Sequence, residues 1–495
     1  PSYPQWRPGD PKPSDKLVIL EDTNADGKAD KSTIFYDKLH CPTGFQFFDG
    51  GVLVMDQPRM IWLKDTDGDD QADHVEHVLD GFATEDTHHS AGAFEMSPAG
   101  RLHMLEGVAT GTALETPWGP FRKHGPSGSY VFDPRSLEIS FFATPGHGNP
   151  WCYVFNEWGQ GIVGDGTGAT QHWDTPLSGA QYRGRKSLQP VFDNERLRPV
   201  VGSDFLRSKH FPDEMQDDFI YACVINMNGI PRWKISDDGA GYKGERERRD
   251  PKDPATAIDL LKSTDKHFRP VDPQIGPDGA LWLGDWANPL IGHMQYSQRD
   301  PNRDKKHGRI YRIVYTGKPL LEPETQHGKS VAEVLEQLKS HQWRTRYRVR
   351  SDLQARESET VLPAAATWLA TVHKEELPQD VKDRLATEVL WLQQSFHRID
   401  GALLKQLLSA KTPDARAAAT RVVADARGQL ADAEAMLIEK ATDPHARVRA
   451  EAVRGLSFFP TERAMQAVLA AATVEPFDPY VTYTADAALG ANVDA

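Results

Sequence analysis

Residues 267–315 read HFRPVDPQIGPDGALWLGDWANPLIGHMQYSQRDPNRDKKHGRIYRIVY, and this stretch shows the pattern that decides the fold. Its first half alternates apolar and polar residues on both sides of the turn Gly276-Pro277-Asp278-Gly279. This pattern is typical of two antiparallel strands joined by a tight turn, in which glycine supplies a positive φ. A polar loop follows, and then another alternating segment, Arg309–Tyr315. A polar and aromatic loop mounted between strands is a typical place for a functional site.

The same turn between two alternating segments recurs along the chain. The turns are marked by Gly50, Gly100, Gly159, Asp218 and Gly279, at spacings of 50, 59, 59 and 61 residues. After each marked pair, a second strand pair is predicted, for example Tyr130–Phe132 with Ile139–Phe142. Four strands per unit at such a period predict a β-propeller.

Residues 16–39 are predicted to form the outer strand pair of one further unit, whose inner pair the sequence does not contain. We therefore expect a six-bladed β-propeller over residues 1–318, with the first blade incomplete at its N-terminus. The missing strands are expected to precede Pro1 in a longer chain, and closure of the ring by another segment is the alternative. Because the sequence begins with Pro1 rather than Met, we expect a mature or trimmed chain.

The composition changes after Pro319, where Ala, Leu, Glu and Arg become frequent and the apolar residues take helical spacing. A short motif recurs at Pro413, Pro444 and Pro479. Proline in a first helical turn, followed by an Ala-rich helix, is typical of stacked helix pairs. The sequence therefore predicts an all-α, HEAT-like helical repeat domain over residues 325–495.

Composition excludes several classes of protein. The chain has 495 residues, too many for one core, and its net charge of −14 argues against nucleic acid or anionic lipid as the main partner. No apolar run reaches the 18 or so residues of a membrane-spanning helix. The three cysteines form no CxxC or CxxCH motif, so neither a paired-cysteine metal site nor a covalently attached haem is indicated.

Two acidic loops have the ligand spacing of the first part of a calcium-binding loop. Oxygen ligands are expected in one loop from Asp22, Asn24, Asp26, the Lys28 carbonyl and Asp30, and in the other from Asp65, Asp67, Asp69 and Asp73. The Glu that closes an EF-hand loop is replaced by Thr33 in the first loop. The alternative for both is a solvated acidic turn. A calcium ion here is expected to be structural.

A second set of polar residues occupies equivalent positions in successive units, so the side chains are expected to meet on one face of the propeller. The set comprises His88, His89, Asn149, Asn226, Asn228, Asp285, Trp286 and Asn288. Paired histidines directly before a strand can act as a base or as metal ligands, and a histidine that only braces loops is the alternative. Asp86 is the nearest carboxylate in sequence to the histidine pair.

Two segments carry a resemblance to a known superfamily. THHSAGAFEMSPAGRLHMLEG and PGHGNPWCYVFNEWGQGIVGDG resemble the soluble quinoprotein glucose/sorbosone dehydrogenases, six-bladed propellers that use pyrroloquinoline quinone and calcium. LEDTNADGKAD, GFATEDTHHS, RDPNRDKKHGRIYRI and the helical tail make nearly the whole chain similar to planctomycete and verrucomicrobial putative membrane-bound dehydrogenases. Such proteins often continue into a c-type cytochrome with a CxxCH motif.

The resemblance implies roles for individual residues. The superfamily's catalytic histidine corresponds to His89, and the Asn of its Arg-Asn pair corresponds to Asn149. The Arg of that pair, which contacts the quinone and the developing oxyanion, is replaced by Gly148. The residues that could take its place are Arg183, Arg185, Lys186 and Arg303.

These observations favour an extracytoplasmic oxidoreductase, periplasmic or extracellular, that oxidises a sugar or other alcohol at the propeller axis. In this interpretation His89, Asn149 and Asp285 are catalytic, and His88, Asn226, Trp286, Asn288 and Arg303 bind the cofactor. The expected cofactors are calcium and pyrroloquinoline quinone, and the expected electron acceptor is a c-type cytochrome. Two rival interpretations stay open. One is a lactonase-like, metal-dependent hydrolase, with a calcium ion held by His88, His89, Asn149, Asn226 and Asp285. The other is a non-catalytic binding scaffold built from propeller and helical repeats.

Overall fold

Strand–turn–strand units form where the sequence alternates. The computed structural model describes residues 9, 14–123, 127–143, 147–175, 190–192, 195, 197–290, 300–304 and 306–493. Arg183, Arg185 and Lys186, three of the candidates to replace the missing arginine, lie outside these residues. Turn residues Asp49 and Gly50 both have positive φ, as the tight turn between the first and second strands of that unit requires.

Five antiparallel sheets of three or more strands follow one another in the described chain. The first contains β3 (Phe45–Phe48), β4 (Gly51–Asp56), β5 (Arg59–Lys64) and β6 (His74–Asp80), and the second β7 (Gly92–Met96), β8 (Leu102–Glu106), β11 (Gly128–Asp133) and β12 (Glu138–Ala143). The third contains β13 (Pro150–Phe155), β14 (Gly161–Asp165) and β15 (Thr170–Trp173). The fourth contains β16 (Val200–Leu206), β17 (Asp218–Cys223), β19 (Arg232–Asp238) and β20 (Gly241–Arg246), extended by β18 (Gly229–Ile230) and β21 (Leu261–Lys262). The fifth contains β22 (Pro270–Ile275), β23 (Leu281–Asp285) and β24 (Arg309–Ile313).

These sheets are the blades of a β-propeller. Their first strands β3, β7, β13, β16 and β22 contact one another in this order, as neighbouring inner strands do. A separate hairpin, β9 (Ala113–Thr116) with β10 (Gly119–Arg122), extends from the second blade. Strand β16 was not predicted, because an eleven-residue connection, rather than a tight turn, separates it from β17.

The expected count of six blades is not met, because the described chain contains five. Residues 16–39 do form the predicted strand pair, β1 (Asp15–Glu21) with β2 (Lys31–Leu39), but this sheet has two strands only. Leu39 and Leu17 pack with Val52 and Val54 of β4, so the pair packs against the first blade. On β3 of the same blade, Phe45 and Phe47 are 52% and 59% exposed, since no described inner strand of another blade covers them.

The predicted helical region follows the propeller. It contains α2 (Val331–Glu336), α3 (Trp343–Gln354), α4 (Ser358–Val372), α5 (Gln379–Ser395), α6 (Gly401–Leu408), α7 (Pro413–Asp425), α8 (Ala433–Lys440), α9 (Ala446–Leu456), α10 (Glu462–Ala472) and α11 (Pro479–Ala491). Two of the three proline motifs place proline in the first turn of α7 and α11, and Pro444 directly precedes the N-cap of α9. These three helices stack in succession. Within the described residues, no helix combines the length and apolar character needed to cross a bilayer.

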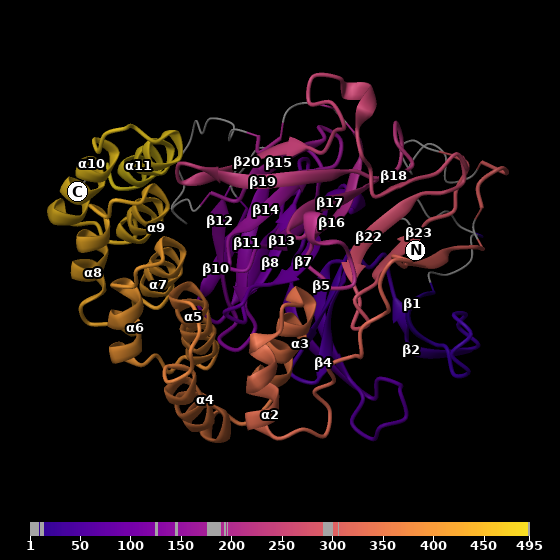
Figure 1. The fold of residues 1–495 in the computed structure, drawn as a ribbon, viewed down its shortest axis with the longest axis horizontal. Helices are drawn as coiled ribbons and strands as arrows, with labels where there is room; N and C mark the ends of the chain where they lie inside the picture. The colour runs from indigo at the N-terminus through magenta and orange to yellow at the C-terminus, as the bar shows by residue number, and fades with distance from the viewer. Residues whose placement is uncertain are drawn as a thin grey trace.

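The helices run along one side of the propeller, from α2 to α11, as Figure 1 shows. They contact the turns between first and second strands: the Gln354 amide donates to the Pro98 carbonyl, and Arg421 donates to the Gly159 carbonyl at 2.7 Å. We call this end of the strands the helix end. The opposite end, where residues 87–91, 147–149, 197–199 and 267–269 lead into β7, β13, β16 and β22, is the loop end.

Candidate functional site

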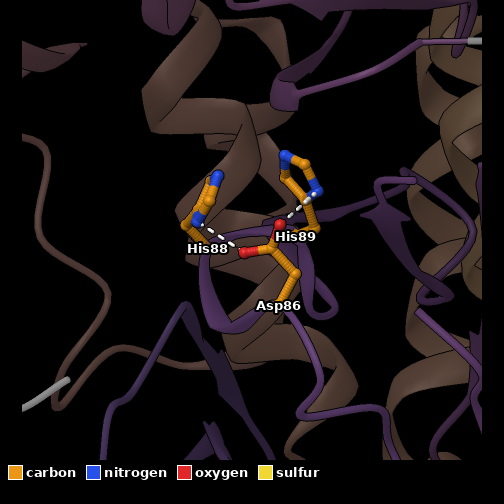
Figure 2. A group of neighbouring side chains, drawn as sticks. All are labelled: Asp86, His88 and His89. Atoms are coloured by element: carbon orange, nitrogen blue, oxygen red, sulfur yellow. Dashed lines mark ion pairs between the residues drawn. The ribbon is translucent and has the colours of Figure 1, made fainter. Parts of the chain in front are cut away.

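The predicted histidine pair lies on a single 3-10 turn, Thr87–His89, at the loop end. The backbone N–H of His89 donates to the Asp86 carbonyl at 2.8 Å, which closes the turn. His88 Nδ1 lies 2.7 Å from Asp86 Oδ1, and His89 Nδ1 lies 3.2 Å from Asp86 Oδ2. Figure 2 shows the two imidazole rings on either side of one carboxylate. The sequence-based expectation that Asp86 neighbours the pair is therefore correct.

The His89 ring is held on both nitrogens and is only 7% exposed. Nδ1 lies 2.8 Å from the Val108 carbonyl oxygen, and Nε2 lies 2.7 Å from Asn149 Oδ1. The close approach depends on Gly107, where a Cβ would lie 2.9 Å from His89 Cγ and 2.8 Å from the Gly148 carbonyl oxygen. His89 thus joins the second blade to the start of the third.

Asn149 is fixed from the third blade. Its backbone N–H donates to Asp165 Oδ1 at 3.0 Å, at the end of β14, and Trp151 Nε1 donates to the His88 carbonyl at 3.1 Å. The structure therefore brings His88, His89 and Asn149 together, as predicted.

Oxygen atoms face both nitrogens of the His89 ring, and this restricts its hydrogens. A carbonyl oxygen only accepts, so a neutral ring with its hydrogen on Nδ1 presents a lone pair at Nε2. That lone pair is then satisfied by the NH₂ of a rotated Asn149 amide or by a hydroxyl in place of the amide. An imidazolium ring donates on both sides without rotation of the amide.

Asp285 is 3% exposed and bonded within its own blade. Its Oδ1 accepts from the backbone N–H groups of Arg269 at 2.7 Å and Ala287 at 2.8 Å, and its Oδ2 lies 3.2 Å from Arg309 Nη1. The bond from the Arg269 N–H matches the bond that Asp165 accepts from the Asn149 N–H. The burial of Asp285 is therefore explained by its bond to the segment that leads into the first strand of its blade. None of these bonds joins it to His89, and its catalytic role stays a prediction.

The predicted cofactor-binding residues of the fourth and fifth blades also brace the loop end. Asn226 Oδ1 accepts from the backbone N–H of Arg198 at 2.8 Å, ahead of β16. Asn288 is fully buried, and its amide donates to the Asp304 carbonyl at 3.3 Å. The Arg303 guanidinium lies 5.3 Å from the centre of the Trp286 ring, at cation–π distance. The bonds found for Asn226 and Asn288 brace loops, and the role of both residues in binding a cofactor stays a prediction.

Pyrroloquinoline quinone carries three carboxylates, so a matching site needs cationic donors beside His89. A Cβ at Gly148 would meet no atom within 4 Å, so the position of the missing arginine is open space. Burial lowers the pKa of Lys123, and its ammonium already donates to the Gly107 carbonyl and to Thr110. Arg269 donates to the carbonyls of Val224 and Asn288. The described residues therefore fit the proton-accepting part of a quinoprotein site but not the binding of a tricarboxylate quinone at position 148.

The two acidic loops form hairpin turns with the same internal bonds. Thr23 donates to Asp30, and Thr66 donates to Asp73, each through backbone N–H and hydroxyl. These bonds lower the pKa of Asp30 and Asp73. Five of the other predicted ligands also accept backbone N–H groups of their own loop: Asp22, Asn24, Asp26, Asp65 and Asp69. The turn is thus built without a metal, and calcium binding stays a prediction.

Sequence reasoning missed the Val108 carbonyl, Asp165 and Trp151. A backbone carbonyl leaves no trace in residue type, and an indole that donates to a loop carbonyl has no periodic signal. Asp165 did have a periodic signal in the sequence, because Asp56, Asp165 and Asp285 all end the second strand of their blade, and all three accept a backbone N–H.

Comparison with known proteins identifies two regions. A family model described as a domain of unknown function, DUF7133, matches residues 1–201 and 175–317, and a HEAT-repeat model matches residues 401–490. No curated protein matches the chain. A solved structure of a luciferin-regenerating enzyme is similar over 59% of this chain and 83% of that chain, with 12% identity and a TM-score of 0.37.

Proposed function

Since the chain belongs to the family of DUF7133, a domain of unknown function, its activity must be argued from its own site, and we propose an oxidoreductase. Its substrate is a sugar or another alcohol, and the hydroxyl proton is taken up by His89. The observation that carries this proposal is the His89 ring, held between Asp86 and Val108 on one side and Asn149 on the other.

In the reacting form Nδ1 carries the ring hydrogen, because the Val108 carbonyl oxygen and the Asp86 carboxylate both accept there. The substrate hydroxyl replaces the Asn149 amide at Nε2. The O–H proton moves to Nε2, and the carbon-bound hydrogen leaves as hydride to a two-electron acceptor, so the alcohol becomes a carbonyl compound. Asp86 favours the imidazolium that forms, because an adjacent carboxylate stabilises positive charge.

The acceptor is the second part of the proposal. The resemblance implies a quinone, which would supply a two-electron acceptor when bound. The described residues fit the proton-accepting part of such a site, but they do not fit quinone binding at position 148. Electrons then pass to a c-type cytochrome, and the protein acts outside the cytoplasm, in the periplasm or extracellularly. The resemblance to quinoprotein dehydrogenases supports both statements. The predicted structural calcium ions are compatible with this location.

The test is dye-linked dehydrogenase activity on a panel of sugars and alcohols, with and without added quinone and Ca²⁺. His89→Ala is expected to lower turnover by about 10²–10⁴-fold, the range of general-base catalysis. His267→Gln is the matched control, because His267 is an exposed histidine of the same loop end. Full activity of His89→Ala on the best substrate would show that His89 is not the base.

A metal-dependent hydrolase is the second candidate, because one observation favours it. Ligand atoms of Asp86, His88 and His89 lie within 4.8 Å of one another. The ligand set expected from the sequence also included Asn226 and Asp285, which are instead bonded within the fourth and fifth blades. Hydrolysis of lactones that depends on added metal, without dehydrogenase activity, would favour this candidate.

A further inference from the structure

We propose that Asp86, His88 and His89 bind a divalent transition-metal ion of the Zn²⁺ class. The inference deepens the proposed function, on which its consequence for activity rests, because the metal would share His89 with the reaction. Metal binding itself is argued from geometry alone.

The donor atoms are spaced like neighbouring ligands of one ion. His88 Nδ1 to Asp86 Oδ1 is 2.7 Å, His89 Nδ1 to Asp86 Oδ2 is 3.2 Å, and His89 Nδ1 to the Val108 oxygen is 2.8 Å. Metal–ligand bonds of about 2.1 Å place neighbouring donors about 3 Å apart at right angles and about 3.4 Å apart in the tetrahedral arrangement that Zn²⁺ prefers, so small side-chain rotations would seat one ion. Two imidazole nitrogens with one carboxylate suit Zn²⁺ and its neighbours, whereas Ca²⁺ prefers oxygen ligands alone.

An independent observation concerns the far side of the His89 ring. Histidines that bind a metal usually donate their second ring N–H to a fixed oxygen. Nε2 of His89 lies 2.7 Å from Asn149 Oδ1, and Asn149 is itself held by the Asp165 carboxylate. With a metal at Nδ1, the ring hydrogen sits on Nε2 and donates to Asn149 Oδ1 without rotation of the amide. The surroundings of His89 are therefore those of a supported metal ligand.

Metal and proton compete for the same atom. The proposed reaction needs hydrogen on Nδ1 and a lone pair on Nε2. A metal at Nδ1 moves the hydrogen to Nε2, which can then no longer accept the hydroxyl proton. Zn²⁺ is therefore expected to inhibit the dehydrogenase activity reversibly, and chelation is expected to restore it.

The experiment titrates the chelator-treated full chain with Zn²⁺ by calorimetry, with Ca²⁺ in excess to occupy the acidic loops. About one equivalent is expected to bind at this site. Asp86→Asn and His88→Gln are each expected to weaken binding by at least about tenfold, since loss even of a supporting group costs 10–100-fold. Asp65→Asn and His267→Gln are matched controls, expected to leave it unchanged.

A second measurement uses Co²⁺ bound to the wild-type chain, so it does not depend on whether a variant folds. Nitrogen ligands are expected to change the visible spectrum of the bound Co²⁺. An oxygen-only spectrum, or Zn²⁺ affinity equal in wild type, Asp86→Asn and His88→Gln, would overturn the metal site. Zn²⁺ that binds without inhibiting would leave the site in place and overturn Nε2 as the base. If His89→Ala is inactive and the wild-type chain binds no Zn²⁺, His89 stays the base and the metal site is overturned.

Discussion

The two ends of the propeller use similar polar residues for different purposes. At the helix end, arginines of the helical region enter the propeller and meet acids there. Arg344 of α3 lies 3.0 Å from Glu95 and 3.1 Å from Asp204, acids from the inner strands of the second and fourth blades. Arg447 of α9 donates to Asp237 and to the carbonyls of Ala240 and Gly241. These charges are paired across the boundary between propeller and helices.

At the loop end, side chains bond to the backbone of their own loops and to the next blade. His89 bridges two blades through Val108 and Asn149, and both of these partners belong to the propeller rather than to the helical region. Both ends are tightly packed in places, since a Cβ at Gly107 beside His89 would lie 2.8 Å from the Gly148 carbonyl oxygen and one at Gly159, at the helix end, 3.3 Å from Trp391. The ends therefore differ in the partners of their polar groups: ion pairs to the helical region at the helix end, and bonds to loop backbone and the next blade at the loop end.

The difference teaches that a shifted pKa can mark a structural network rather than a candidate site. Burial raises the pKa of Glu95 to about 7, despite the nearby Arg344 guanidinium. Burial also raises the pKa of Asp174 to about 6. Both groups belong to fully buried networks, where the structural ion pairs and hydrogen bonds explain the shifts.

Replacing Arg344 is expected to have the largest effect on stability, because it removes the ion pairs that distinguish the helix end. Arg344→Met leaves Glu95 and Asp204 buried without their cation, and loss of one partner of a buried ion pair costs about 3–5 kcal/mol. Urea unfolding measures this loss in the free energy of unfolding. Arg348→Met is the control on the same helix, because Arg348 donates to Thr345 of its own helix rather than to an acid of the propeller. Equal losses for both variants would mean that Arg344 is not the key contact.

A pH series sharpens the comparison at Glu95. Its pKa is raised in the folded state, so between about pH 4.5 and 7 the folded protein binds more protons than the unfolded chain. The free energy of unfolding should therefore fall as pH rises through this window, by up to about 3 kcal/mol from this group. Glu95→Gln should lack this fall, so its stability relative to wild type should improve from pH 5 to pH 8. Parallel profiles would contradict the assignment.

Each acidic loop provides the smallest expected effect of the three. These loops join outer strands at the helix end but lie outside the helix contacts described above. Saturating Ca²⁺ at about 100 times its dissociation constant should stabilise the protein by about 2.7 kcal/mol per site. The melting temperature should rise with Ca²⁺, fall with chelator and respond less in Asp22→Asn. A chelator that changes nothing in wild type would favour solvated acidic turns.

The sequence predicted most of the blades, because alternation and glycine turns are local signals. It did not predict β16, whose connection to β17 carries no tight turn, nor the count of five blades. In the site, paired histidines near Asp86 were visible directly, and Asn149 came from its place in the repeat and from the resemblance. Asp285 was assigned to the site for its place in the repeat, but place does not reveal that its oxygens hold backbone N–H groups. The Arg344 pairs join residues more than 100 positions apart, beyond any local pattern.

Arg344 has a consequence for how this architecture can be rearranged. One side chain of α3 holds acids from two non-adjacent blades, with Trp343 donating to Asp204 beside it. The amino-acid composition changes at the boundary between the propeller and the helices, but the two parts are not independent modules, because buried ion pairs cross this boundary. A gene fusion that moved the helices onto another propeller would carry a buried cation into a surface without its acids. Exchange between such proteins therefore has to transfer both parts together.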